Sequence, residues 1–289
     1  MSYVFHIATL AAIYSSLAMS LNLIVGETGL AGLGHAAFFG IGAYTSALLA
    51  IGFGASPWLG ILAGGMTGTA LGVVIGFPSL RLKGDYLALA TLGLGIVFHA
   101  IARNWISLTR GPVGIPGIPP LAVLSHSLTN EWEYFLFAAA LAGATWLLMW
   151  RIVSSPFGRV LRGVRDDEHA MSALGCYTRR IKITAFAVSA AVAGLAGGLY
   201  AHYMTYISPG HFTASESILV LLMVIVGGMG SLRGPLVGAV ILVALPEVLR
   251  LTGLPSSVSA SLRQILYGLL LVGLMIWRPQ GVFGKARLR

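Results

Sequence analysis

The residues that could do chemistry are few, and most of them lie in one glycine-rich stretch. The segment 22–44 reads NLIVGETGLAGLGHAAFFGIGAY and holds Asn22, Glu27, Thr28, His35 and Tyr44 among apolar residues. Glu27 and His35 are the only nearby pair that could serve as acid and base. Eight residues with several glycines separate them, so the sequence does not fix their geometry.

Enzyme signatures are missing from the rest of the chain. The sequence contains no GxxxxGK[ST] loop, no HExxH, no GxSxG and no clustered metal ligands. A single cysteine, Cys176, excludes an internal disulfide framework and a cysteine-based metal site. We therefore expect no catalytic residue, no metal and no cofactor on this chain.

The composition is that of an integral membrane protein. Of 289 residues 57% are hydrophobic and only 9% are charged, and the mean hydropathy is +0.87. Soluble domains carry about 25% charged residues, so this chain could not cover a water-facing surface. The net charge of +9 comes from basic residues too few and too scattered to indicate nucleic-acid binding. The sequence predicts one membrane domain over residues 1–289.

A helix needs about 20 apolar residues to cross the hydrocarbon core, and this rule predicts an all-α bundle of about nine transmembrane helices. The spans fall near residues 4–25, 30–52, 57–77, 86–102, 134–150, 183–203, 217–232, 235–249 and 262–277. The GGMGSLRGP run after Val226 reads as a tight turn or helix break.

The basic residues predict the orientation of the bundle. With nine spans, 14 of the 18 basic residues fall on one side, which includes the loop 151–182 and the tail 278–289. Cytoplasmic loops retain Lys and Arg, so we expect that side to be cytoplasmic and the N-terminus to be outside. The proline- and glycine-rich loop 103–133 would then be external, either as a docking surface or as a cap over the bundle.

Glycines recur every fourth residue along the third predicted span. This ridge predicts close packing of helix backbones inside the bundle or between subunits, because lipid supplies no hydrophobic drive for association. Ala190, Gly194 and Gly198 repeat the spacing in the sixth span. The ridge consists of Gly60, Gly64, Gly68, Gly72 and Gly76.

At membrane depth, ionisable groups tend to face the bundle interior or water, and broken helices often form transport sites. The candidates for a translocation pathway are Asn22, Glu27, Thr28, His35, Tyr44 and Thr91. Two simpler interpretations remain open. Glu27 would lie at the cytoplasmic interface, and His35 would hydrogen-bond a neighbouring carbonyl.

The loop 154–182 predicts an amphipathic cytoplasmic helix over residues 157–175. Ser155 followed by Pro156 is a helix-start signal, and Gly175 is a plausible stop. Phe157, Val160, Leu161, Val164, Met171 and Leu174 form one apolar stripe, and Arg162 and Asp166 form an i,i+4 pair. Such a helix would lie on the lipid interface or bind a groove of a soluble partner. Three consecutive acids favour the partner, since anionic lipid would repel them.

Carboxylates for ion coupling are scarce, with only Glu27, Glu216 and Glu247 near the membrane. If transport is active, this scarcity favours energy supplied by a partner ATPase.

Four segments then resemble one family, the branched-chain amino acid ABC-transporter permeases, and more closely its LivM-type subunit. They are SLNLIVGETGLAGLGHAAFFGIGAYTSALL, PSLRLKGDYLALATLGLG, SPFGRVLRGVRDDEHAMSALG with RRIKITAFAVSAAVAGLAGGLYA, and GGMGSLRGPLVGA. They occur in the family's order and cover nearly the whole chain.

The resemblance implies a permease in a bacterial or archaeal inner membrane. Its partners would be a LivH-type permease, two cytoplasmic ATPases that bind ATP and Mg²⁺, and a periplasmic or tethered binding protein. Contact with an ATPase would be made by Phe157, Gly158, Arg159, Leu161, Arg162, Arg165, Asp166, Asp167 and Glu168.

The sequence departs from the family pattern at three positions, and the first two bear on the substrate. Ile96 replaces a common acidic residue, Val113 replaces a polar residue in the external motif, and Arg233 replaces a common tryptophan. Relatives import urea, short-chain amides or aromatic acids as well as branched-chain amino acids. An ion-coupled secondary transporter is a further alternative.

Overall fold

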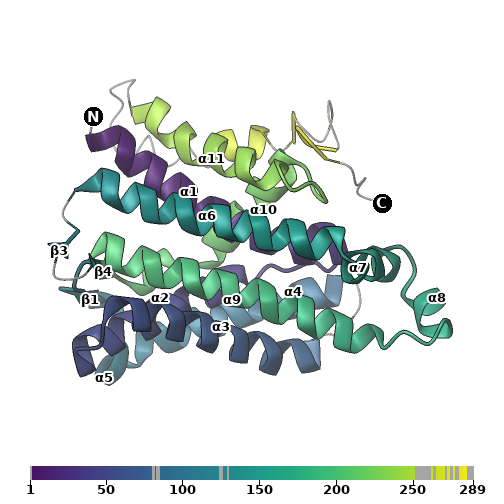
Figure 1. Cartoon of the computed structure of the whole chain (residues 1–289), viewed down its shortest axis with the longest axis horizontal. Coiled ribbons are helices and arrows are strands. Elements are labelled where there is room, and N and C mark those ends of the chain that lie inside the picture. Colours follow the sequence, from purple (N-terminus) through teal and green to yellow (C-terminus); the bar gives the residue numbers. More distant parts are fainter. Residues whose placement is uncertain are drawn as a thin grey trace.

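The computed structural model describes residues 2–79, 82, 85–123, 126–128, 130–250, 262, 265–270, 272–273, 276 and 280–284. These residues form a bundle of long helices whose axes run roughly along one direction (Figure 1). The long helices are α1 (Ser2–Asn22), α2 (His35–Phe53), α3 (Pro57–Ser79), α4 (Asp85–Asn104), α6 (Glu131–Ser154), α9 (Thr178–Met204), α10 (Ala214–Gly227) and α11 (Gly234–Arg250). The prediction of an all-helical bundle is confirmed in this coarse form.

Among the described residues, seven helices are long and apolar enough to cross a membrane, and Gly234–Glu247 of α11 is a shorter apolar helix. Seven are therefore found where the sequence predicted nine. Of the ninth predicted span, 262–277, residues 262, 265–270, 272–273 and 276 are described and are helical, whereas most of the tail 278–289 lies outside the described residues.

Short elements connect the long helices at the two ends of the bundle. One end, on the left of Figure 1, carries α5 (Ile106–Thr109), β1 (Ile115–Pro116), β3 (His126–Ser127) and β4 (Tyr206–Ile207). Antiparallel pairs join β1 to β4 and β2 (Ala122–Val123) to β3. The opposite end carries α7 (Pro156–Asp166) and α8 (Glu168–Ala173). Single turns of 3₁₀ helix, η2 (Gly111–Val113) and η3 (Pro209–His211), complete the first end.

The glycine ridge of α3 lies against α2 and α9. A Cβ atom added at Gly64 would lie 2.8 Å from the Gly42 carbonyl oxygen, and one at Gly194 would lie 2.3 Å from the Gly64 carbonyl oxygen. Gly60 faces Ser46, while Gly68 and Gly72 face Ala190. Because no side chain separates these backbones, α2, α3 and α9 form the most tightly packed part of the bundle. Gly76, the last of the ridge, is also buried.

Two predicted spans are interrupted. The sequence placed a span over 30–52, but α2 begins only at His35, and residues 29–34 are not helical. The span over 217–232 was also wrong at its end, because α10 stops at Gly227. Gly228 has φ +112, which an L side chain rarely adopts.

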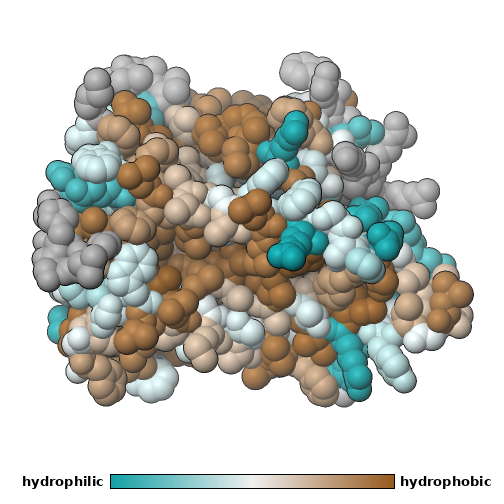
Figure 2. Space-filling view, in the orientation of Figure 1, coloured by the Kyte–Doolittle hydropathy of each residue, from teal (hydrophilic) through white to brown (hydrophobic). Residues whose placement is uncertain are grey.

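The surface agrees with burial in lipid. In Figure 2 the visible face is mostly brown across its middle, and many of the teal residues lie toward the end that carries α7 and α8. Exposed apolar side chains such as Met66, Leu89 and Leu147 lie on α3, α4 and α6. In water such a surface would be costly, whereas a bilayer solvates it.

Candidate functional site

The charged residues nearest the bundle interior meet at the α7 end. Helix α1 continues there through a π-helical turn, η1 (Leu23–Glu27), which carries the Glu27 carboxylate. The Arg162 guanidinium of α7 donates to Glu27 Oε2 at 3.1 Å, and the Glu27 side chain is only 3% exposed. A buried carboxylate needs such a partner. The ion pair therefore ties α7 to the end of α1.

Arg165, one turn further along α7, makes a second tie. Its Nη1 donates to the backbone carbonyl oxygen of Gly26 at 2.9 Å, and its aliphatic stem lies against Gly29. Gly29 has φ +70, and a Cβ atom there would lie 2.6 Å from Arg165 Cγ. The arginine stem thus occupies space that any larger residue at position 29 would need.

A third contact joins η1 to the turn between α10 and α11. The buried Asn22 amide donates to the Ser231 carbonyl oxygen and accepts from the Gly230 backbone N–H, both at 3.0 Å. A Cβ atom at Gly26 would lie 2.5 Å from the Gly230 nitrogen, so the two backbones touch. Consequently α7, η1 and the glycine turn 228–231 form one connected unit, which we call the end cluster.

The local sequence explains how α7 directs Arg162 and Arg165 toward η1. The Ser155 hydroxyl accepts from the Gly158 N–H and Pro156 opens the helix, as the sequence predicted. Leu161 and Val164 are buried, and Phe157 packs on the same apolar cluster. Gly158 is buried too. A Cβ atom there would lie 2.3 Å from the Val153 carbonyl oxygen, so the site has no room for a side chain.

Two details of the predicted cytoplasmic helix were wrong. It is not continuous over 157–175, because Asp167 leaves the helical conformation and caps α8. Its carboxylate accepts from the Ala170 and His169 N–H groups, and these bonds hold the pKa of Asp167 below its usual value. Nor does Arg162 pair with Asp166, since it reaches Glu27 instead. Asp166 accepts from Arg165 at 3.2 Å.

Of the other residues predicted to contact a partner, some are exposed to solvent and one pairs with another residue of this chain. Arg159, Asp166 and Asp167 are exposed. Glu168 instead forms a 2.6 Å ion pair with Lys182 of α9, whose side chain is 5% exposed. Sequence reasoning did not single out Lys182. A lysine in the first turns of a membrane helix reads as an interfacial anchor.

The non-helical segment 29–34 leads from the end cluster into the bundle. The Leu33 N–H donates to the Thr91 hydroxyl of α4 at 3.0 Å, and Gly34 touches the Thr91 backbone. At the start of α2, the Ala36 N–H donates to the Ser217 hydroxyl of α10 at 3.0 Å. Side chains thus satisfy backbone groups that a continuous helix would have paired, as membrane burial requires.

His35 lies at the junction of this segment and α2. A 2.7 Å hydrogen bond joins its Nε2 to the Ser20 hydroxyl of α1, so its partner is a hydroxyl rather than a carbonyl. Thr28 donates to the Ile24 carbonyl oxygen at 2.5 Å, within its own turn. Among the pathway candidates the structure therefore places Asn22, Glu27 and Thr28 near the end cluster, with His35 and Thr91 next along the segment.

Tyr44 stands apart from the other candidates. Its ring packs against Phe98 and Phe212, with centroids 6.2 Å and 5.8 Å away, and it is 5% exposed. Within the part of the chain that the structure describes, its buried hydroxyl has no hydrogen-bond partner. Sequence reasoning missed Ser20, Ser217, Gly230 and Ser231, which hold the site together. Only the GGMGS run gave a signal for any of them.

Comparison with known proteins identifies the family. The model of the family described as "Branched-chain amino acid transport system / permease component" matches residues 3–275. The chain belongs to this family. It is 39% identical to the high-affinity branched-chain amino acid transport system permease protein LivM of Escherichia coli K12, over 97% of this chain and 70% of that relative.

Two more distant relatives show the breadth of the permease family. The chain is 24% identical to the permease protein LivH of the same organism's branched-chain amino acid system, over 97% of this chain and 94% of LivH. It is 27% identical to the autoinducer 2 import system permease protein LsrC of Yersinia pseudotuberculosis, over 94% of this chain and 78% of LsrC. No solved structure matches the chain. The resemblance to LivM-type permeases is confirmed.

Proposed function

We propose that the chain is the LivM-type permease subunit of an ABC importer for branched-chain or other hydrophobic amino acids. The observation that carries this proposal is the end cluster. It connects α7, a partly exposed helix that this proposal places on the cytoplasmic side, through Glu27 and Gly26 to a broken stretch of helix inside the bundle. Such an arrangement can convert a push on α7 into movement beside the predicted pathway.

The energy comes from outside the chain in this proposal. Two ATPases bind ATP and Mg²⁺, and α7 with α8 lies against one of them. Arg159, Asp166 and Asp167 form the contact, because they are exposed while Leu161 and Val164 are buried. ATP-driven closure acts on the permease only through contacts that differ between its two states. A LivH-type permease forms the other half of the pathway, and a periplasmic binding protein delivers the substrate.

The orientation follows from the shared end of the bundle. The described tail residues support it, because the Val282 and Phe283 N–H groups donate to the Val226 and Gly227 carbonyl oxygens at 3.0 and 2.8 Å. Val282, Phe283, the α10–α11 turn and α7 therefore share one end, on the side to which the sequence pattern assigns most basic residues. In the proposed topology this end faces the cytoplasm of a bacterial or archaeal cell, nine helices span the membrane, and the N-terminus is external.

Helix-surface variants test the coupling. The Arg159 side chain makes no hydrogen bond or ion pair within the described residues, so Arg159→Glu leaves the fold intact while reversing a charge on the proposed contact. We expect loss of ATP-dependent uptake and of co-purifying ATPase at unchanged membrane expression. The matched control is Arg103→Glu at the opposite end of the bundle. Normal uptake by Arg159→Glu would remove α7 as the coupling surface.

The substrate is settled by a separate measurement. Thermal stabilisation of the binding protein that supplies this permease, across a panel of branched-chain amino acids, urea, amides and aromatic acids, measures differential ligand affinity. Stabilisation by a branched-chain amino acid is the expected result. Stabilisation by urea, an amide or an aromatic acid alone would reassign the substrate without changing the transporter class.

A further inference from the structure

We infer that the chain holds an anionic phospholipid, with one acyl chain in a groove between α1, α6 and α11 and its head group in a basic cavity at the α7 end. This site goes beyond the transport proposal and depends only on membrane embedding. The orientation of the bundle in the membrane decides only from which leaflet the lipid comes.

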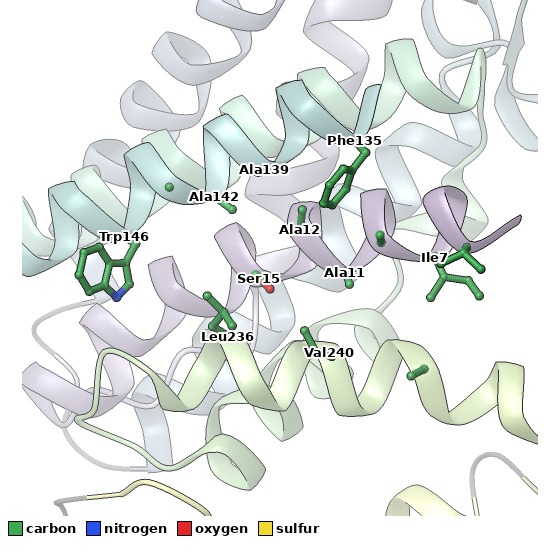
Figure 3. A pocket seen from close by; sticks show the side chains of 14 residues that line it. Ile7, Ala11, Ala12, Ser15, Phe135, Ala139, Ala142, Trp146, Leu236 and Val240 are labelled. Atoms are coloured by element: carbon green, nitrogen blue, oxygen red, sulfur yellow. The ribbon is translucent and has the colours of Figure 1, made fainter. Parts of the chain in front are cut away.

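The apolar part is an open groove of about 700 Å³. Figure 3 shows Ala11 and Ala12 of α1, Ala139 and Trp146 of α6, and Val240 of α11 around it. Small side chains form most of its floor, and Gly143 leaves further open space, since a Cβ atom there meets nothing within 4 Å. In a bilayer a depression of this kind fills with hydrocarbon, because an empty one would forfeit its dispersion contacts.

The polar part adjoins the groove one helical turn along α6. A cavity of about 390 Å³ is lined by Glu27, Arg162, Arg165 and Trp150, among others. A neighbouring cavity of about 380 Å³ shares Val153, Gly230 and Leu232 with it and adds Arg233 and Phe283. Trp146 lines the groove and Trp150 lines the cavity, so the two regions lie end to end.

The charge of the cavities specifies the head group. Three arginines line them against the single carboxylate of Glu27, and counting Asp166, which pairs with Arg165, still leaves an excess of one positive charge. Arg233 is exposed, and its side chain has no hydrogen bond or ion pair to any described residue. Basic pockets between membrane helices bind anionic head groups, and tryptophan favours the same interfacial depth.

The dimensions fit one leaflet. From Trp150 back to Ala139 is eleven residues of α6, or about 16 Å at 1.5 Å per residue. Half of a hydrocarbon core is about 15 Å thick. An acyl chain attached to a head group in the cavity therefore reaches the middle of the groove. A helix of another subunit would fill the groove as well, but it would give no reason for the basic side chain of Arg233 beside it, which pairs with no described residue.

Native mass spectrometry tests the site on the chain purified in mild detergent with any subunits that remain bound. Dioleoylphosphatidylglycerol is titrated against dioleoylphosphatidylcholine. We expect one phosphatidylglycerol to be retained in preference to phosphatidylcholine. An interfacial arginine changes such binding about fivefold, so Arg233→Gln should weaken phosphatidylglycerol retention by about that factor and Arg233→Lys should restore it.

A second pair of variants tests the groove. Gly143→Leu should displace the acyl chain and abolish retention, while Gly52→Leu, at an equally open position on α2, should not. Equal retention of both lipids by the unaltered chain would overturn the proposal. So would a Gly143→Leu chain that keeps its lipid but loses a co-purifying permease, because the groove would then be a subunit interface. If Gly143→Leu does not fold, the Arg233 variants still decide, since that side chain is exposed and makes no hydrogen bond or ion pair with a described residue.

Discussion

The ion pair between Glu27 and Arg162 gives the sharpest test of the end cluster. The two residues are 135 positions apart in the sequence, and their contact is the direct link from α7 to η1. A hydrogen bond to a charged group contributes about 1.5–3 kcal/mol. Because the Arg162 side chain is 36% exposed, solvent screening reduces the stabilisation by the pair to about 1.5 kcal/mol. That value corresponds to roughly a tenfold change in the population of the tethered state.

A double-mutant cycle measures this coupling directly. Glu27→Gln, Arg162→Gln and the double variant are reconstituted with the partner subunits in proteoliposomes, and ATP-driven uptake is compared at equal protein. Each single variant should lose about tenfold in uptake. The double variant should lose no more than the worse single one, which gives an interaction energy of about 1.5 kcal/mol. Arg151→Gln, an exposed change at the end of α6, is the control.

Independent losses would refute the reasoning. If the two single losses multiply in the double variant, the side chains act separately, and the tether carries no coupling. Unchanged uptake in both single variants would have the same meaning. A fall in membrane expression in Arg162→Gln alone would instead measure the cost of leaving the buried Glu27 carboxylate without its partner.

Further predictions follow from the same contacts. Asn22→Leu removes both 3.0 Å bonds to the α10–α11 turn, so we expect a loss of about 1–3 kcal/mol in unfolding free energy, seen as a lower melting temperature by fluorescence-detected size exclusion. Gly194→Ala should destabilise by about 1–3 kcal/mol because its Cβ would meet the α3 backbone, whereas Gly143→Ala should be neutral or stabilising in the same assay. The pKa of Asp167 is lower in the folded chain than in the unfolded chain, where it is about 3.9. Its cap therefore stabilises α8 fully when the pH is above about 3.9, and this contribution disappears as the pH falls through the folded pKa. Asp167→Ala should therefore increase hydrogen exchange at the Ala170 amide at pH 7 relative to Asp167→Asn, and equal exchange in both would count against the cap. Cys176, the single cysteine, lies at the α8 end, so an impermeant maleimide should label inside-out vesicles and not intact cells, and the reverse pattern would invert the proposed topology.

The sequence predicted what depends on composition and local pattern. Apolar runs located the helices, Ser155 and Pro156 located the start of α7, and the four-residue glycine spacing located the ridge that meets α2 and α9. Each of these depends on neighbours within a few residues. The same local information marked 227–235 as a break, and α10 indeed ends at Gly227.

Contacts between distant segments could not be predicted in this way. Glycines near Gly29 indicated a break but not where α2 would resume, because His35 is fixed by Ser20 of α1 and the neighbouring backbone by Ser217 of α10. The sequence also did not determine whether Arg162 would form its ion pair with Asp166 or with Glu27. A local i,i+4 pair contributes only about 0.2–0.5 kcal/mol, so a buried carboxylate brought near by the fold prevails.

These contacts also determine which part of the bundle can respond to a push on α7. Around Gly42, Gly64 and Gly194 the backbones of α2, α3 and α9 touch, so sliding them would force backbone atoms together. The elements tied to α7 are different, because individual side-chain hydrogen bonds and the Glu27–Arg162 ion pair hold η1, residues 29–34 and the α10–α11 turn. Exchanging such bonds costs about 0.5–1.5 kcal/mol each, far less than separating packed helices. We therefore expect a displaced α7 to move η1 and the segment beside Thr91 first, while α3 and α9 serve as the fixed frame.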